Sequence, residues 1–352
     1  MERLALITGS PGPIADAVAG ALGAVGFASR HAPVAPDGRL RLEVDPRGAD
    51  AVVHLGLRTP RDLDEGLRTE AERAAASAAA GLARAAGARR LVHVSTVAVY
   101  GKPRNLPCRE GELKAPRTAY ERIRWRAEQA SWSAFRRGAP LTVLRPAILY
   151  GPTLRGGPVR ALSLVALFNQ GRRRVPIIRR GPVAHVLHLD DLARAVAHVV
   201  THPDDGAVIG RAFNVGDDAP LPLAEHLAAA LAALGYEPGR VLPALPRLTG
   251  AILWLLRNVP DRALLEGMNR RLASAWDALA GRTRITSSSA PRVDREALHW
   301  MSADHYYETS RLAEIGWRPA YPVSTEAMPA TIRALLAARV LPGSGTGALP
   351  AW

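Results

Sequence analysis

Short apolar runs alternate with longer alanine-rich stretches along the first half of the chain. Five of these runs predict strands: Arg3–Thr8, Phe27–Arg30, Ala51–Leu55, Arg90–Ser95 and Leu141–Arg145. The stretches between them predict helices: Ala15–Gly26, Leu63–Ala86 and Tyr120–Arg137. Continuously apolar strands are typical of parallel sheets covered on both faces, and strands that alternate with helices form βαβ units. The pattern therefore predicts an α/β fold with a doubly wound parallel sheet.

The pattern changes after Tyr150, where Gly and Pro recur up to Pro182 and indicate a loop region. Strand character returns at Ala184–Leu189 and Ala212–Val215, with a helix between them at Asp191–Thr201. Three further helices are predicted: Leu223–Leu234, Leu248–Asn258 and Asp261–Ala280. They indicate a second, smaller lobe in the C-terminal half.

These elements predict two domains and a tail. We expect a nucleotide-binding domain over 1–150, to which 183–215 return. We expect a substrate-binding lobe built from 151–182 and 216–340. Residues 341–352 are rich in Gly and Pro, and we expect them to be a disordered tail.

The composition agrees with a globular protein of two domains. The chain has 352 residues, of which 48% are hydrophobic and 22% charged. The single cysteine, Cys108, excludes an internal disulfide and a cysteine-based zinc site, and no residue spacing indicates another metal site. The N-terminus has no signal-peptide pattern, and the apolar run Leu248–Leu256 is far shorter than the about 20 residues that span a bilayer. We therefore expect a cytoplasmic protein without membrane insertion.

The net charge of +14 raises the question of nucleic-acid binding. Lys102 and Lys114 are the only lysines, so the other 44 of the 46 basic residues are arginines. These arginines are scattered along the chain, and aromatic residues make up only 5% of it. The distribution indicates an arginine bias rather than a basic binding face, and we expect no nucleic-acid partner.

A glycine-rich loop follows the first predicted strand and opens the first predicted helix. Gly9 permits a tight turn, and Gly12 lets a pyrophosphate approach the backbone. Pro13 suits the first helical turn, because its missing N–H would have no partner there. Ser10 and Ile14 complete the loop, and the start of the helix offers N–H groups to a phosphate. The loop predicts a dinucleotide site on a Rossmann-type domain.

The end of the second predicted strand bears on the choice of cofactor. A carboxylate there would bind the adenosine 2′-hydroxyl of NAD. The strand is expected to end at Ser29-Arg30-His31, and no acidic residue follows before Asp37. Arg30 could instead face a 2′-phosphate. We therefore expect NADP, with NAD left open as the alternative.

Several segments, taken in order, resemble the extended short-chain dehydrogenase/reductase family, the NAD(P)-dependent epimerase/dehydratase-like proteins. Asp50–Gly56 resembles the family pattern D-x-V-x-H-L-A, and Val94–Gly101 resembles V-S-S/T-x-x-V-Y-G. Three more segments are similar to L-R-P-x-x-x-Y-G-P, H-V-D-D-x-A and N-V-G: Leu144–Pro152, His188–Ala193 and Asn214–Gly216. The resemblance implies further cofactor contacts, with Asp45 beside the adenine: Asp45, Leu55, Gly56, Ser95, Pro146 and Ile148.

The family's chemistry uses a Ser or Thr hydroxyl and a Y-x-x-x-K pair on one helix. The resemblance places the hydroxyl at Thr96 and the general acid/base at Tyr120, but the lysine position holds Arg124. A free tyrosine has a pKa of about 10 and needs a nearby cation to act near neutral pH. Arginine supplies the charge but cannot lose its proton to a relay. Two interpretations follow: an NAD(P)-dependent oxidoreductase acting on a secondary alcohol or ketone, or a redox-silent NAD(P)-binding protein.

A third interpretation is a sugar-nucleotide epimerase. Members that act on sugar nucleotides carry an R-D-aromatic triplet before H-V-D-D, where this chain has Ala184-His185-Val186. That difference makes the sugar-nucleotide interpretation weaker. The helices Leu63–Ala86 and Tyr120–Arg137 correspond to those that pair in many family dimers, so the resemblance implies a homodimer that acts on a small molecule.

Overall fold

The computed structural model describes residues 3–35, 37–38, 45–57, 64–178, 181–242, 254, 265–285, 289–294, 297 and 300–344. The chain divides into two compact units. The first consists of Met1–Ala147, Leu187–Gly216 and Tyr307–Ala320. The second consists of Ile148–Val186, Asp217–Tyr306 and Tyr321–Trp352.

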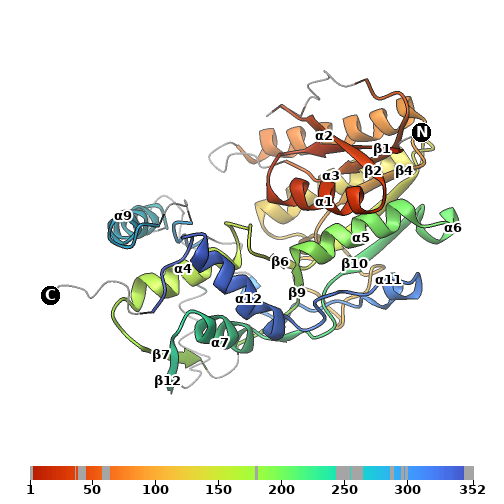
Figure 1. The fold of residues 1–352 in the computed structure, drawn as a ribbon. Coiled ribbons are helices and arrows are strands. Elements are labelled where there is room, and N and C mark those ends of the chain that lie inside the picture. The colour runs from red at the N-terminus through yellow and green to blue at the C-terminus, as the bar shows by residue number, and fades with distance from the viewer. Residues whose placement is uncertain are drawn as a thin grey trace. The chain divides into compact units, whose positions relative to one another are not determined.

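The first unit is built on a six-stranded sheet in the order β10-β5-β4-β3-β1-β2, in which every pair of neighbours is parallel (Figure 1). Its strands are β1 (Arg3–Gly9), β2 (Phe27–Pro33), β3 (Ala49–His54), β4 (Arg90–Val94), β5 (Leu141–Pro146) and β10 (Arg211–Val215). All five residues of β4 are buried, as expected for a strand covered on both faces. The predicted fold class, a doubly wound Rossmann-type sheet, is confirmed.

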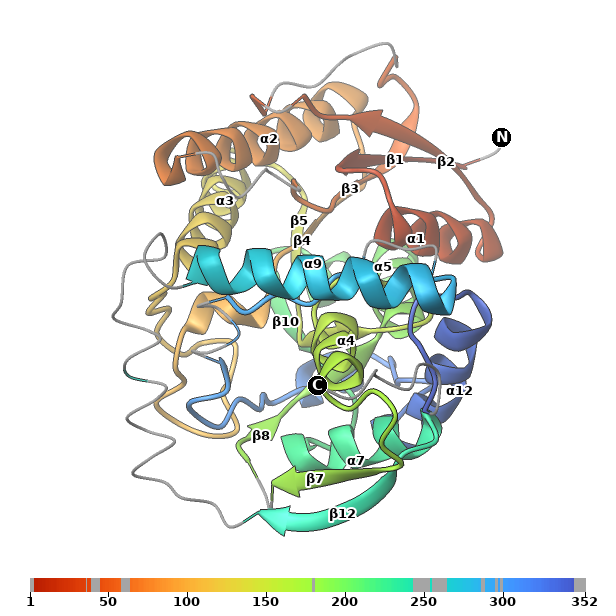
Figure 2. The ribbon, with the colours of Figure 1, turned by 90° about the vertical axis from the view of Figure 1, so that its left-hand side faces the viewer.

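Helices cover both faces of this sheet. Helices α1 (Pro13–Ala24) and α5 (Leu189–Thr201) pack together on one face, and α2 (Glu65–Ala86) and α3 (Ala119–Phe135) pack together on the other (Figure 2). Helix α2 begins where Asp64 accepts hydrogen bonds from the first-turn N–H groups and ends at Gly87 in the left-handed conformation. A short 3₁₀ helix, η1 (Val97–Tyr100), follows β4, and α6 (Asp205–Val208) precedes β10.

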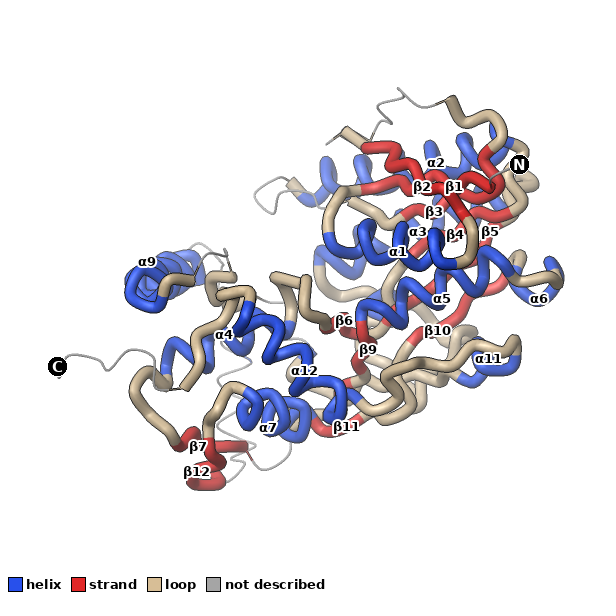
Figure 3. The backbone as a smooth tube through the Cα atoms, viewed as in Figure 1, coloured by secondary structure: helices blue, strands red, loops and turns tan. Residues whose placement is uncertain are grey.

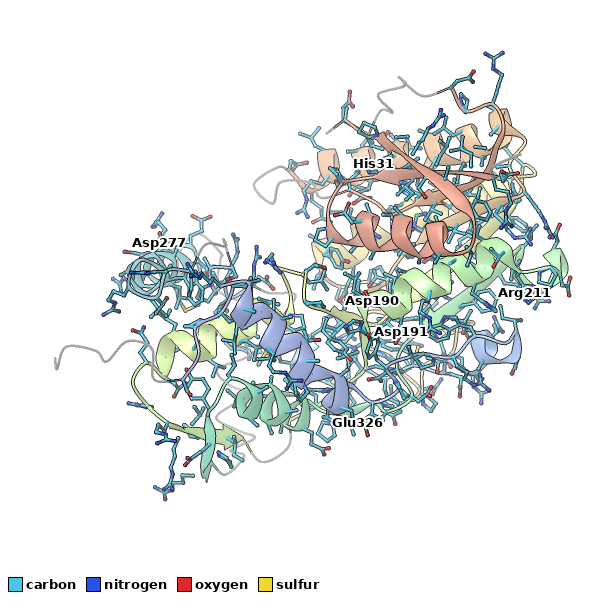
Figure 4. The ribbon with its side chains drawn as sticks, in the orientation of Figure 1. His31, Asp190, Asp191, Arg211, Asp277 and Glu326 are labelled. Atoms are coloured by element: carbon cyan, nitrogen blue, oxygen red, sulfur yellow. The ribbon has the colours of Figure 1, made fainter. Side chains whose placement is uncertain are left out.

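A late segment of the chain, Tyr307–Ala320, completes the first unit and contains α11 (Ser310–Glu314). The buried carboxylate of Asp191, in the first turn of α5, accepts a hydrogen bond from the Ala320 N–H at 2.7 Å (Figure 4). Asn214 on β10 donates to the carbonyl of Glu308 at 3.1 Å. The sequence-based division placed this segment in the second lobe, because nothing in its own pattern shows these distant partners.

In its described residues, the second unit contains helices and short strand pairs (Figure 3). Its helices are α4 (Pro158–Phe168), α7 (Leu223–Ala233), α9 (Leu265–Thr283) and α12 (Ser324–Ala337). Its strands pair as β7 (Arg174–Ile178) with β12 (Glu237–Leu242), and as β8 (Val183–Ala184) with β11 (Leu221–Pro222). Trp276 of α9 is 2% exposed and lies in the apolar core of this unit. Strands β6 (Ile148–Tyr150) and β9 (Val186–His188) lie where the chain passes between the units.

Several predicted boundaries were wrong. Strand β2 continues to Pro33 instead of ending near Arg30. The predicted strand Ala184–Leu189 is interrupted at His185, and α5 already begins at Leu189.

In the second unit, the stretch read as a Gly/Pro loop contains α4, because Pro158 stands at the first helical position, where a missing N–H costs nothing. At the predicted tail, Leu341 is buried and Ser344 N–H donates to the Leu234 carbonyl, so 341–344 are ordered. Residues 345–352 and all of the predicted helix Leu248–Asn258 except Trp254 lie outside the described residues.

Candidate active site

The predicted glycine loop lies at the carboxyl edge of the sheet, where β1 and β3 are neighbours. The sheet continues from β1 to β2 on one side and from β1 to β3 on the other, and ligands bind at such a point of divergence in doubly wound folds. The Leu55 N–H donates to the Thr8 carbonyl at 2.9 Å, and the Ser10 N–H donates to the Gly56 carbonyl at 3.0 Å. A Cβ on Gly9 would stand 2.5 Å from the Gly56 oxygen, so this approach requires glycine.

Helix α1 begins directly after this loop. Gly12 precedes the helix with φ 136°, a conformation that favours glycine, and Pro13 follows at the start of the first turn. As a glycine, the N-cap residue Gly12 has no side chain with which to cap the helix. Ile14 is half-buried in the first turn. The backbone turn at Gly9, Ser10 and Gly12 therefore leads directly into the start of α1, and the N–H groups at the start of a helix can receive a phosphate.

Strand β2 presents basic rather than acidic side chains. Arg30 is exposed and pairs in register with Leu6, three residues before the strand ends at Pro33. His31, labelled in Figure 4, pairs with Ile7, and burial lowers its pKa while Asp16 partly offsets this. No residue of β2 is a carboxylate. Arg30 thus lies in mid-strand and not, as its use in predicting the cofactor assumed, at the end of the strand.

Asp45, predicted beside the adenine, is engaged by its own neighbour. Its Oδ1 accepts hydrogen bonds from the backbone N–H and the Nε–H of Arg47, both at 3.0 Å. These hydrogen bonds lower the pKa of the exposed Asp45 carboxyl. The preceding residues 39–44 lie outside the described residues.

Arg124 lies one helical turn after Tyr120 on α3, and its side chain is buried at the carboxyl edge of the sheet. Its Nη2 donates to the Val94 carbonyl at 2.7 Å, and its Nη1 lies 3.5 Å from Oε2 of Glu72. Burial opposes the charge of Arg124, but attraction to Glu72 and to Tyr120 outweighs burial, and the pKa of Arg124 is raised. Nη1 also lies so close to Gly56 that a Cβ there would clash with it.

Two histidines on adjacent strands lie near this guanidinium. His54 of β3 pairs in register with His93 of β4, and their ring centres are 5.2 Å apart. Thr8 Oγ1 lies 2.9 Å from Nδ1 of His54, and Ser131 Oγ lies 2.8 Å from Nδ1 of His93. Burial lowers the pKa of both rings, and Arg124 adds to the effect, bringing the pKa of His93 to about 3. Both rings are therefore neutral at neutral pH.

The other predicted catalytic residues lie at the starts of two elements that pack together, η1 and α3. Tyr120 is 40% exposed in the first turn of α3, whose start is fixed by a capping box between Thr118 and Glu121. Thr96 precedes η1, and its Oγ1 accepts a hydrogen bond from the Ala98 N–H at 3.2 Å. Helix α3 packs against η1. Thr96, Tyr120 and Arg124 therefore all belong to one corner of the first unit.

The remaining predicted cofactor residues differ in their surroundings. Ser95 is buried, and its Oγ donates to Oε2 of Glu128 at 2.6 Å. Glu128 also forms a buried ion pair with Arg145 at 2.6 Å, next to Pro146 at the end of β5. Ile148 belongs to the second unit.

Sequence analysis missed Glu72. This carboxylate is 2% exposed on α2, and it lies 52 positions before Arg124 in the chain. No spacing rule connects the two, and an acidic residue in an alanine-rich helix is usually solvated. Only an amphipathic pattern that assigned position 72 to the buried face could have indicated it.

The profile of the NAD dependent epimerase/dehydratase family matches residues 37–216. The chain belongs to this family. The match spans the strands β3, β4 and β5 and the Tyr120–Arg124 segment of α3. The predicted family resemblance is confirmed, and with it a nicotinamide dinucleotide as the cofactor of the family. No curated protein matches the chain.

Solved structures share the fold of this family member. UDP-galactose 4-epimerase superposes with a TM-score of 0.63 at 18% identity, over 95% of this chain and 99% of that one. The terminal R domain of the myxalamid PKS-NRPS pathway gives 0.69 at 18% identity, over 97% and 92%. RMD from Pseudomonas aeruginosa, solved with NADPH, gives 0.61 at 17% identity, over 94% and 98%. At these identities the likeness concerns the fold alone.

Among the described residues, no three His, Cys, Asp or Glu side chains gather as they would around a metal ion. None of the described helices is long and apolar enough to cross a membrane.

Proposed function

We propose that this family member is an NAD(P)-dependent oxidoreductase that interconverts a secondary alcohol and a ketone. The observation that supports this most is the placement of Arg124. Its guanidinium is anchored to the Val94 carbonyl at the carboxyl edge of the sheet, one turn after Tyr120 and against Gly56. A fixed positive charge beside the cofactor loop and the acid/base residue is what the chemistry requires.

The proposed cofactor loop lies at the same edge of the sheet. Gly9, Ser10, Gly12, Pro13 and Ile14 would hold the pyrophosphate at the start of α1. Leu55, Gly56, Ser95, Pro146 and Ile148 are the further cofactor positions that the family pattern implies, with Asp45 toward the adenine. A bound nicotinamide dinucleotide would supply the hydride donor or acceptor.

We propose NADP as the preferred form. A carboxylate at the end of β2 would repel a 2′-phosphate, and β2 has none. Arg30 adds an exposed positive charge on the same strand. NAD remains the alternative, because Arg30 lies three residues from the end of the strand.

In the proposed reaction, Tyr120 moves the proton and Thr96 orients the reacting oxygen. The phenol of Tyr120 donates its proton to the oxygen of a ketone during reduction, and the deprotonated side chain takes the hydroxyl proton of an alcohol during oxidation. The guanidinium of Arg124 supplies a fixed positive charge on the same helix, one turn after Tyr120. Because arginine does not release its proton, the proton taken up by Tyr120 must pass to solvent, to which the side chain is 40% exposed.

The experiment is a comparison of binding and turnover. Titration of NADPH should show binding to both the wild type and Tyr120→Phe, while a panel of ketones should be reduced by the wild type alone. General acid–base catalysis typically contributes about 10²–10⁴-fold, so the loss in the variant should be unmistakable. A wild type that binds no nicotinamide dinucleotide would refute the proposal.

A redox-silent NAD(P)-binding protein is the second candidate. One observation favours it: the position that holds lysine in the family is Arg124, whose guanidinium donates a hydrogen bond to the Val94 carbonyl and pairs with Glu72. Arginine stays protonated and cannot pass a proton along a relay. Under this alternative, NADPH binds but Tyr120→Phe changes no measurable rate.

A sugar-nucleotide epimerase is less favoured. The triplet that would hold the diphosphate is Ala184-His185-Val186, and it contains no arginine. The His185 side chain is buried, with Nε2 2.7 Å from the Asp217 carbonyl oxygen. We propose instead a small-molecule substrate without a nucleotide, turned over in the cytoplasm by a homodimer.

A further inference from the structure

Helix α2 carries three glutamates with different surroundings. Glu65 and Glu70 form surface ion pairs with Arg122 and Arg73. Glu72 is 2% exposed. A carboxylate is rarely buried this completely without a specific partner, because its desolvation is costly.

Both carboxylate oxygens of Glu72 face the cofactor edge of the sheet. Oε1 accepts a hydrogen bond from the Leu57 N–H at 3.1 Å, directly after Gly56. Oε2 lies 3.5 Å from Nη1 of Arg124. Glu72 therefore joins two groups of the proposed site, the backbone after β3 and the cation on α3.

Among the residues that the structure describes, the neighbouring groups leave Glu72 as the direct ionic partner of Arg124. Glu128 also attracts the guanidinium, but its oxygens are engaged by Arg145, Ser95 and Trp132. The nearby His54 and His93 rings are neutral. Burial raises the pKa of Glu72, and Arg124 partly offsets this, as expected for a carboxylate desolvated in order to pair with that cation.

We propose that Glu72 is a positioning residue that holds the Arg124 guanidinium between the Val94 carbonyl and Gly56. The inference rests on the proposed function, because the held cation is the one that assists Tyr120. In this chain the position of the Arg124 guanidinium depends on the ion pair with Glu72 of α2 as well as on its attachment to α3. The guanidinium is buried, and a buried charge is costly unless it is paired, so the Glu72 carboxylate stabilises it in this position.

The test compares three variants of α2. Glu72→Gln keeps the size of the side chain and an oxygen for the Leu57 N–H but removes the charge. Glu72→Asp restores the charge on a shorter side chain. Glu70→Gln is the matched control, because it removes the same charge from the exposed face of the same helix, where Glu70 pairs with Arg73.

Calorimetric titration of NADPH should show about tenfold or greater weakening for Glu72→Gln, since small misplacements in a site carry large costs. Glu72→Asp should recover part of the loss, and Glu70→Gln should bind as the wild type does. Equal affinities for all four proteins would overturn the inference while leaving the proposed function intact.

Crystal structures of the wild type and of Glu72→Gln supply a readout that does not need the cofactor. We expect Nη2 of Arg124 to leave the Val94 carbonyl in the variant. An unmoved guanidinium would overturn the inference, whether or not NADPH binds. If Glu72→Gln does not fold, the same comparison with Glu72→Asp decides: the guanidinium should shift, and an unchanged position and affinity would refute the role.

Discussion

Arg124 occupies the space that a methyl group on Gly56 would need. Residue 56 has φ +76°, and a Cβ built there would clash with Nη1 of Arg124. The family patterns have alanine where this chain has Gly56, and lysine where it has Arg124. The chain thus departs from the pattern at two residues that are in contact, and the smaller residue makes room for the larger one.

This relationship predicts a coupled effect on stability. Gly56→Ala should lower the free energy of unfolding by about 2–4 kcal/mol, the sum of overpacking and of a left-handed backbone at a non-glycine residue. In the Arg124→Lys background the cost should be smaller by about 1 kcal/mol or more, because the forked end is gone. Denaturant unfolding of the two single variants and the double variant measures the difference.

Gly48→Ala is the control for the backbone component. Gly48 has φ +78° and no atom within 4 Å of a built Cβ, so its substitution should cost only about 1–2 kcal/mol. Gly56→Ala could lower the free energy of unfolding no more than Gly48→Ala does, or by the same amount in both backgrounds. Either result would show that the contact with Arg124 does not affect stability.

The second prediction concerns the cofactor. NADPH should bind more tightly than NADH by about 1–3 kcal/mol if one charged contact with the 2′-phosphate forms. Arg30→Ala should remove this preference and leave the NADH affinity unchanged, so NADH serves as the internal control. Calorimetry that finds NADH equal or better would contradict the preference for NADP. If the variant Arg30→Ala still prefers NADPH, another residue must cause the preference.

The third prediction follows from the neutral His93 ring. Its pKa is about 3 in the fold and 6.5 when unperturbed, because burial and then Arg124 disfavour its charge. Below pH 6.5 the unfolded chain binds a proton that the folded chain does not. The free energy of unfolding should therefore fall by about 1.4 kcal/mol per pH unit from this residue alone as the pH drops from 6.5 toward 3.

His93→Asn should flatten this decline, since asparagine keeps a polar group for Ser131 but does not titrate. Urea unfolding between pH 7.5 and 4 gives the two curves. They should run parallel above pH 6.5 and diverge below it. Curves that stay parallel at acid pH would show that His93 does not resist protonation in the fold.

The fourth prediction concerns assembly. On α2, Ala71, Ala75 and Ala79 are buried within the chain, whereas Ala74 and Ala78 keep exposed surface. We expect a homodimer through α2 and α3, so light scattering should give twice the chain mass of 37.6 kDa. Ala78→Arg should shift the mass toward that of the monomer. A monomer mass for the wild type at micromolar concentration would refute the dimer.

Sequence patterns predicted the parts of the site that lie close together in the chain. The turn at Gly9 and Gly12 and the four-residue spacing from Tyr120 to Arg124 are local features with local physical causes. The end of β2 was misplaced because Ser29, Arg30 and His31 give no apolar signal on an edge strand.

Contacts between segments that are distant in the chain could not be predicted in this way. Glu72 meets Arg124 only because α2 and α3 cover the same face. Asp191 meets Ala320 only because the chain returns to the first unit after passing through the second. No pattern in a single sequence indicates such pairs, since neither residue of a pair departs from what is usual in its own segment.

The most direct test of the account is a crystal structure of the protein with NADP⁺. The account predicts the Tyr120 hydroxyl and Thr96 on the side of the nicotinamide that receives or gives the hydride. It predicts the Arg124 guanidinium at the Val94 carbonyl and outside the nicotinamide site. A structure in which the Arg124 side chain fills the nicotinamide site, with the nicotinamide outside the protein, would contradict the oxidoreductase function.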